Sequence, residues 1–143
     1  MIKLVSVVVP VLNSKDSLTM LLDALARQQT EYSYEVVVVD DGSKTDLEPV
    51  RELFKFKLLL KWHKLLFNRG PAYARNEGIK LAEGDVVLFT DADCIPRANW
   101  LQKMTEPFEE PCVTGVKGIY ETNQKDTWAQ LAQLEFEDRK SVV

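Results

Sequence analysis

The chain has 143 residues, of which 45% are hydrophobic, 28% charged and 9% aromatic. This length suits one domain over residues 1–143 and is too short for two, and the composition is that of a folded chain. The formal net charge of −4 argues against a nucleic-acid-binding protein, which is usually basic. Residues 51–80 nevertheless carry eight Lys or Arg against two acids, which indicates a local anion site, a surface contact or a solvated face.

The cysteine and histidine content limits the metal chemistry that the chain can support. Two cysteines, Cys94 and Cys112, and one histidine, His63, lack the spacing of a zinc site. The apolar N-terminal stretch lacks a cleavage site, and no apolar run reaches the roughly 18 residues of a membrane-spanning helix. The sequence therefore predicts a cytoplasmic protein, and association with the cytoplasmic face of a membrane stays open.

The first half of the chain predicts two strands that alternate with two helices. A strand at residues 3–10 is followed by a helix at residues 14–29, with Ser14 or Ser17 as the N-cap. That helix has an apolar stripe made of Leu18, Leu21, Leu22, Leu25 and Ala26. A second strand at residues 34–40 precedes a helix at residues 45–56. Its first turn contains Pro49, and its inward residues are expected to be Val50, Leu53 and Phe54.

The second half repeats the alternation. A strand at residues 57–62 is interrupted by lysines, whereas the strand at residues 85–90 is apolar on both faces, as are the first two. Between them lies a helix at residues 71–84, with Gly84 as its C′ glycine. A last helix is predicted at residues 97–108.

Alternating strands and helices predict an α/β fold with a mostly parallel sheet and right-handed crossovers. In such sheets ligands bind beyond the carboxyl ends of the strands. The informative residues should therefore follow each strand, at residues 10–13, 40–43 and 91–93. All three groups are expected on one edge of the sheet.

Asp40 and Asp41 follow the second strand and precede Gly42 and Ser43. A carboxylate there could accept hydrogen bonds from a base or a ribose hydroxyl, but Asp-Gly-Ser is also common turn chemistry. The acid pair of phospho-receiver domains follows the first strand, so the order excludes that reading.

The segment "NRGPAYARNEGI" places Arg69, Gly70 and Arg75 at the start of a helix. Free N–H groups at a helix N-terminus favour anions, and an arginine one turn further in could reach a diphosphate with both nitrogens. A surface arginine and a turn glycine explain the same residues equally well. Neither a dinucleotide fingerprint nor a P-loop is present.

The segment "VVLFTDADCIP" ends an apolar strand on Asp91 and Asp93, separated by Ala92. Two carboxylates so close disfavour each other's ionised form unless a cation lies between them. A hard divalent cation, Mn²⁺ or Mg²⁺, would suit both carboxylates and would complete its shell with phosphate oxygens and water. Two alternatives are a turn that exposes both acids to water and the nucleophilic motif of haloacid-type phosphatases. The latter follows the first strand of its fold, not the fourth.

Four segments in series, "VSVVVPVLN", "EVVVVDDGS", "GPAYARNEGI" and "GDVVLFTDADCIP", resemble family 2 glycosyltransferases in order and spacing over most of residues 4–100. The resemblance implies a GT-A (Rossmann-like) fold with a mostly parallel sheet flanked by helices. It also implies a nucleotide-diphosphate sugar donor, an unknown acceptor (glycan, lipid or protein) and inversion at the anomeric carbon. The nucleotide-sugar-binding residues that it implies are Pro10, Val11, Asn13, Asp40, Asp41, Arg75, Asp91 and Ala92. Asp93, together with Asp91, would ligate Mn²⁺ or Mg²⁺.

The chain departs from the family pattern at its end, because members usually continue into an acceptor-binding half that supplies the general base. Glu137 and Asp138 come early for that motif and are weak candidates for the base. We therefore expect the donor-binding half of a metal-dependent glycosyltransferase. A non-catalytic nucleotide-sugar-binding module is the alternative. The basic, apolar segment at residues 54–67 leaves open a peripheral membrane contact or an oligomer contact.

Overall fold

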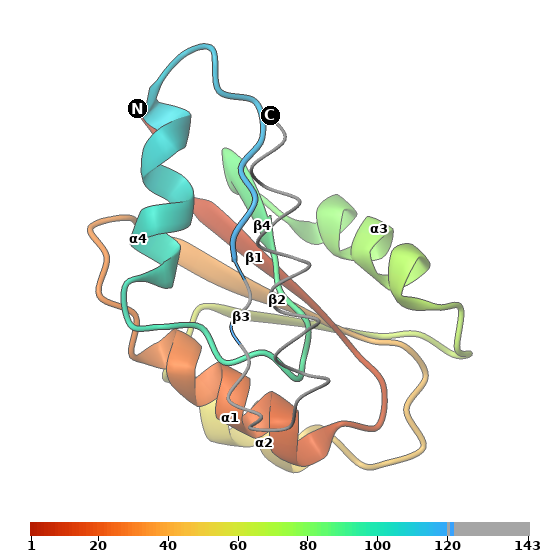
Figure 1. The fold of residues 1–143 in the computed structure, drawn as a ribbon. Helices are drawn as coiled ribbons and strands as arrows, with labels where there is room; N and C mark the ends of the chain where they lie inside the picture. Colours follow the sequence, from red (N-terminus) through yellow and green to blue (C-terminus); the bar gives the residue numbers. More distant parts are fainter. Residues whose placement is uncertain (120, 122–143) are drawn as a thin grey trace, which may run out of the picture.

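The computed structural model describes residues 1–119 and Glu121. Its centre is a four-stranded parallel sheet in the order β3-β2-β1-β4 (Figure 1). The strands are β1 (Val5–Val11), β2 (Tyr34–Asp40), β3 (Leu60–Lys64) and β4 (Val86–Phe89). The predicted α/β class with a parallel sheet is confirmed.

Helices cover both faces of this sheet (Figure 1). On one face, α1 (Lys15–Ala26), α2 (Glu48–Phe54) and α4 (Trp100–Thr105) pack on Val5, Val7, Val9 and Val11. On the other face, α3 (Pro71–Leu81) packs on Val8, Val37 and Val39. Successive strand residues point to opposite faces, so a strand buried on both must be apolar at every position. This explains the unbroken valine runs of β1 and β2.

Two details of the predicted third strand and second helix are wrong. The third strand begins at Leu60 instead of residue 57, because the turn after α2 continues through hydrogen bonds from the N–H groups of Lys57 and Leu58 to Phe54 O. Leu53 is 50% exposed, since the short helix α2 buries only Val50 and Phe54, one turn apart.

The predicted helix ends also differ. Helix α3 stops at Leu81, so Gly84 is not its C′ residue; a Cβ there would lie 2.6 Å from Ser6 N. Gly84 is needed because the chain crosses β1 at close range. Ser14 occupies the N-cap position of α1, but its hydroxyl donates to Leu12 O and caps no N–H. The last predicted helix divides into α4 and a 3₁₀ turn, η1 (Glu106–Glu109).

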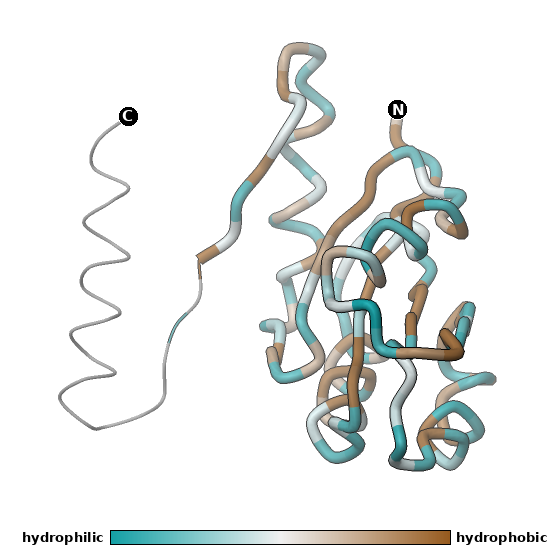
Figure 2. Tube along the Cα trace, turned by 90° about the vertical axis from the view of Figure 1, so that its right-hand side faces the viewer, coloured by the Kyte–Doolittle hydropathy of each residue, from teal (hydrophilic) through white to brown (hydrophobic). Residues whose placement is uncertain are grey.

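The chain after η1 leaves the body of the molecule (Figure 2). Residues 114–118 form one wall of a groove of about 670 Å³, with β4 and the side chains of Met104 and Phe108 on the other side. Within the part of the chain that the structure describes, β4 pairs only with β1, so its outer edge borders this groove. None of the described helices is long and apolar enough to cross a membrane.

A buried carboxylate lies at the amino end of the sheet, opposite the strand ends that the sequence singles out. Glu35 is 1% exposed, and its Oε1 accepts hydrogen bonds from Ser6 Oγ (2.6 Å) and Glu83 N (2.8 Å). The Lys61 ammonium lies 2.8 Å from Oε2. Burial alone would raise the pKa of Glu35, but the hydrogen bonds from Lys61, Ser6 and the Glu83 amide outweigh it and lower that pKa below 4.5. Glu35 is therefore a charged anchor between three strands.

We predict that Lys61→Met will destabilise the fold by about 3 kcal/mol at neutral pH, because it leaves the Glu35 carboxylate buried without its cation. Because the folded-state pKa of Glu35 is lowered, its stabilising contribution is complete above the unfolded value of 4.5 and is lost as pH falls through the folded value. The deficit of the variant should therefore shrink as the pH falls below 4.5. Urea unfolding at neutral and at acidic pH measures it.

The matched control for this prediction is Lys55→Met. Lys55 pairs with Glu52, and both side chains are well exposed, at 40% and 52%. Loss of that surface pair should cost less than about 1 kcal/mol at either pH. An equal cost for the two variants would contradict the role assigned to Glu35.

Candidate functional site

Four loops meet at the carboxyl ends of the strands. Asn13 connects the first two: its N–H donates to Ser43 Oγ (2.8 Å), and its Oδ1 accepts hydrogen bonds from Lys44 N and Thr45 N (2.8 and 3.2 Å). Asn13 adopts a left-handed backbone conformation with φ of 59°, which asparagine tolerates better than most residues. Pro10 and Val11 are buried at the end of β1, and their backbone lies at the base of the candidate site at this edge.

The two acids after β2 hold loops in place. Asp41 is 3% exposed, and its Oδ1 and Oδ2 accept hydrogen bonds from Arg69 N (2.7 Å) and Gly70 N (2.9 Å). Asp40 is 1% exposed; its Oδ1 accepts a hydrogen bond from Ser43 N at 2.8 Å, and Lys64 Nζ lies 3.8 Å from Oδ2. These contacts fit the turn chemistry that the sequence left open. Each carboxylate oxygen of Asp41 keeps a further lone pair for a ligand.

Gly42 allows the loops after β2 and β3 to touch. Its φ is 74°, and a Cβ there would lie 2.7 Å from Asn68 N and from Phe67 C. Any side chain at this position would push the two backbones apart. The loop that leads into α3 is therefore seated on the loop after β2, and Gly70 begins that helix with φ of 90°, a conformation that glycine alone adopts readily.

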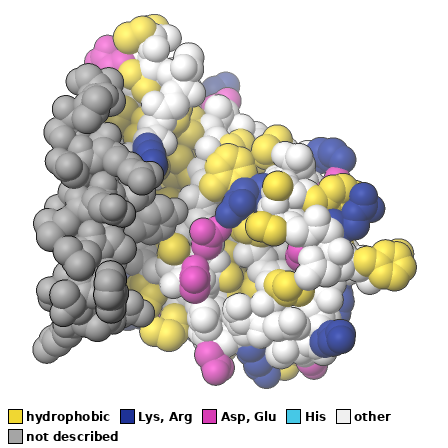
Figure 3. Space-filling model, turned by 45° about the vertical axis from the view of Figure 1, so that its right-hand side comes forward, with side chains coloured by type: hydrophobic (Ala, Val, Ile, Leu, Met, Phe, Trp, Pro, Cys, Tyr) yellow, Lys and Arg dark blue, Asp and Glu magenta, His cyan; other side chains and the backbone are white. Residues whose placement is uncertain are grey.

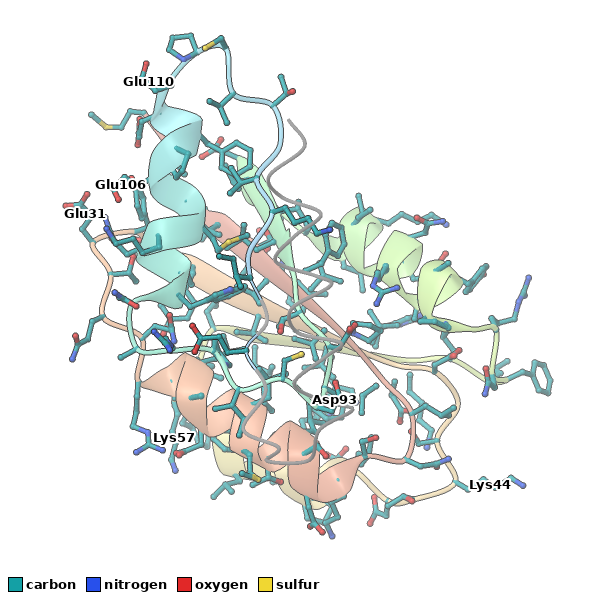
Figure 4. The ribbon with its side chains drawn as sticks, in the orientation of Figure 1. Glu31, Lys44, Lys57, Asp93, Glu106 and Glu110 are labelled. Carbon is teal, nitrogen blue, oxygen red and sulfur yellow. The ribbon has the colours of Figure 1, made fainter. Side chains whose placement is uncertain are left out.

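The acids after β4 face α3. The Arg75 guanidinium, one turn into α3, pairs with Asp91 at 2.6 Å between Nη2 and Oδ1. Both side chains are half-buried, at 34% and 47% exposed, so the pair remains accessible. Asp93, in the segment that follows β4, is exposed (Figure 4), and Ala92, between Asp91 and Asp93, is buried. The structure therefore brings Arg75, Asp91 and Asp93 to one place.

The cluster contains a third candidate ligand that the sequence reasoning missed. Ligand atoms of Asp91, Asp93 and Cys94 all lie within 4.8 Å of one another, and Cys94 N donates to Asp91 O at 3.0 Å in the turn that gathers them. Ligands on opposite sides of a Mn²⁺ or Mg²⁺ ion lie about 4.2 Å apart, so a limit of 4.8 Å is close to the size of a site for one small cation. The position of Cys94 directly after the acid pair was the available signal.

The chemistry of these donors favours a hard cation. Burial raises the pKa of the Cys94 thiol, and the charges of Asp93 and Asp91 raise it further against the lowering effect of the Asp91 backbone. Hard divalent cations prefer carboxylate oxygen to sulfur, so the carboxylates are the effective donors. Carboxylate oxygens suit Mn²⁺ and Mg²⁺.

The two weak candidates for a general base, Glu137 and Asp138, lie outside the described residues.

Comparison with known proteins places this geometry in a family. A family model described as Glycosyl transferase family 2 matches residues 6–141. The chain is 30% identical over 138 residues to YfnE of Bacillus subtilis, named as an uncharacterized glycosyltransferase, covering 90% of this chain and 35% of YfnE. It is 44% identical over 90 residues to the poly(ribitol-phosphate) beta-N-acetylglucosaminyltransferase TarS of Staphylococcus aureus, covering 62% of this chain and 16% of TarS. The chain thus spans about a third or less of these relatives.

Solved structures show the same sheet. The crystal structure of TarS residues 1–349 with UDP matches with a TM-score of 0.69 and 34% identity, covering 85% of this chain and 39% of that one. A mannosyltransferase of Pyrobaculum calidifontis in complex with GDP-Man and Mn²⁺ matches with a TM-score of 0.70 and 29% identity, covering 76% of this chain and 33% of that one. The matched sheet and the family model over residues 6–141 agree, and the chain belongs to glycosyl transferase family 2, with a GT-A fold.

Proposed function

We propose that this chain carries the donor-binding part of a glycosyltransferase that moves a sugar from a nucleotide-diphosphate sugar to an acceptor hydroxyl with inversion. The observation that carries the proposal is the cluster of Arg75, Asp91 and Asp93 at the carboxyl edge of a family 2 sheet. The complexes of TarS with UDP and UDP-GlcNAc support a nucleotide-sugar donor. The Mn²⁺ complex of the mannosyltransferase supports a divalent cation.

Different described residues would bind the nucleotide, the sugar and the cation of the donor complex. The backbone at Pro10, Val11 and Asn13 would line the nucleotide pocket, and Asp41, positioned by Asp40 and its loop, would accept a hydrogen bond from the base.

At the other side of the pocket, Asp91 and Ala92 would lie against the ribose or the sugar, and Asp93 with Asp91 would hold the cation. The cation, when bound, neutralises charge on the departing diphosphate.

Arg75 has two partners in this scheme. In the structure it pairs with Asp91 at 2.6 Å, which places a positive charge beside the acid pair. The Asp91 and Asp93 carboxylates would hold the cation, and the Arg75 guanidinium could bind the diphosphate oxygens through two nitrogens. The same arginine would therefore offset charge beside the acid pair and add to donor affinity.

Transfer itself needs a base that deprotonates the acceptor hydroxyl, so that its oxygen attacks the anomeric carbon as the diphosphate departs from the opposite face. We place this base outside the described residues. A non-catalytic nucleotide-sugar-binding module is the second candidate, because the cluster of Arg75, Asp91 and Asp93 supports binding of the donor whether or not transfer follows.

Calorimetric titration of the chain with UDP and GDP, with Mn²⁺ and with EDTA, tests the proposal. We expect one of the two nucleotides to bind at least about tenfold more tightly with Mn²⁺, because the cation joins the diphosphate to the carboxylates. The matching nucleoside monophosphate, which lacks the second phosphate, should gain much less. Absence of binding by both diphosphates would contradict the proposal. Hydrolysis of UDP-GlcNAc or GDP-mannose by the chain would then separate a transferase from a binding module.

A further inference from the structure

Two large apolar side chains in the loop between β3 and α3 are exposed to solvent. Leu66 is 89% exposed and Phe67 is 73% exposed, and they are adjacent in the chain. We call these two residues the Leu66–Phe67 tip. Single exposed apolar residues are common on protein surfaces, but two large neighbours at the end of a loop form a compact protrusion.

The backbone beneath the tip is fixed on both sides. Before it, Leu65 is buried and its N–H donates to Asp40 O at 2.8 Å. After it, the N–H groups of Arg69 and Gly70 donate to the buried Asp41 carboxylate. At its centre, the backbone of Phe67 and Asn68 packs against Gly42 with no room for a Cβ. These hydrogen bonds and the packing against Gly42 hold the tip in an outward position. Less conformational entropy is therefore lost when the tip binds.

Two cations flank the tip, and acids are absent from its segment. Residues 64–76 contain three Lys or Arg and no Asp or Glu, in a chain whose net charge is −4. Lys64 and Arg69 flank the tip; the Lys64 side chain is 58% exposed, and the Arg69 guanidinium lies 4.2 Å from the centre of the Tyr73 ring. Lys44 projects from the neighbouring loop (Figure 4), and Lys or Arg side chains lie beside hydrophobic ones on this face (Figure 3).

We propose that the Leu66–Phe67 tip, with Lys44, Lys64 and Arg69, binds the surface of an anionic lipid bilayer. Apolar side chains at the headgroup boundary and cations above anionic lipids are the two contributions that hold peripheral proteins on membranes. The other segments of the chain are acidic overall, so a general electrostatic attraction is excluded and the contact must be local.

The tip also orients the proposed site. It lies at the carboxyl edge of the sheet, on loops joined by the Asp41 hydrogen bonds to the donor side of the molecule. A chain seated on a bilayer through this tip presents that edge toward the membrane. The inference, which here rests on the proposed function, is that the acceptor is carried by a membrane lipid or displayed at the bilayer surface.

Co-sedimentation of the chain with vesicles tests the contact without any nucleotide. We expect binding to phosphatidylcholine vesicles that contain about 30% phosphatidylserine, weak binding to pure phosphatidylcholine, and loss of binding at high salt. The double variant Leu66→Ser, Phe67→Ser should bind at least about tenfold more weakly. Lys64→Gln should bind about fivefold more weakly, the effect of one cation near an anionic surface.

Phe56→Ser provides the matched control. Phe56 is 91% exposed and also has lysine neighbours, Lys55 and Lys57, but it precedes β3 and lies at the opposite end of that strand. Its replacement should leave vesicle binding unchanged. Failure of the wild-type chain to bind anionic vesicles, or equal binding by the tip variant, would overturn the proposal. Vesicle binding without nucleotide binding would retain the membrane contact and reject the proposed donor site, and the reverse result would reject only the contact.

Discussion

Asp93→Ala is expected to lower the Mn²⁺-dependent affinity for a nucleoside diphosphate by about a hundredfold or more. Removal of a hydrogen-bond partner behind a metal ligand already costs 10- to 100-fold, typically, and the loss of a ligand costs at least as much. Asp93 is exposed, and among the described residues its side chain accepts only a weak hydrogen bond from the Cys94 thiol at 3.8 Å. The fold should therefore keep its stability, and the loss should appear only in binding.

Calorimetry with the nucleotide that binds the wild-type chain measures this effect, with thermal unfolding as the check on folding. Asp23→Ala is the matched control, because it removes an exposed carboxylate that pairs with Arg27 toward the far end of α1. That variant should bind nucleotide and Mn²⁺ as the wild type does. Unchanged affinity in Asp93→Ala would remove Asp93 from the proposed metal site.

Gly78→Val is expected to destabilise the chain by about 3 kcal/mol or more, at the upper end of the cost of overpacking a core. A Cβ at Gly78 would lie 2.3 Å from Val8 Cγ1 and 3.4 Å from Val39 Cγ2. Both valines are fully buried in central strands, so neither can move aside. Gly78→Ala should cost less, because the better helix propensity of alanine offsets about 1 kcal/mol of the clash.

Urea unfolding of both variants measures this cost. Asn76→Val, on the exposed face of the same helix, is the control for the poor helix propensity of valine and should cost less than about 1 kcal/mol. Equal losses for Gly78→Val and Asn76→Val would show that α3 does not need its close approach to β1. Because α3 also carries Arg75, displacement of this helix should weaken nucleotide binding as well.

The sequence by itself determined the class of the fold and the edge where the site lies. Unbroken valine runs in β1 and β2 require helices on both faces, and parallel strands bring the residues that follow them to one edge. Motif order was enough to name the family and to single out Arg75, Asp91 and Asp93. The strand, helix and motif patterns each lie within a few neighbouring residues of the chain. For that reason they can be recognised from the sequence alone.

Only the tertiary structure decided which partners each polar group has. Arg75 and Asp91 are 16 residues apart, and Asp41 reaches amides 28 and 29 residues away. The sequence placed Glu35 inside a strand but did not show that it pairs with Ser6 and Lys61. It also assigned Gly84 to a helix end, whereas the structure uses it where the chain crosses β1. Such contacts depend on how elements distant in sequence pack together, and no periodicity along the chain encodes that packing.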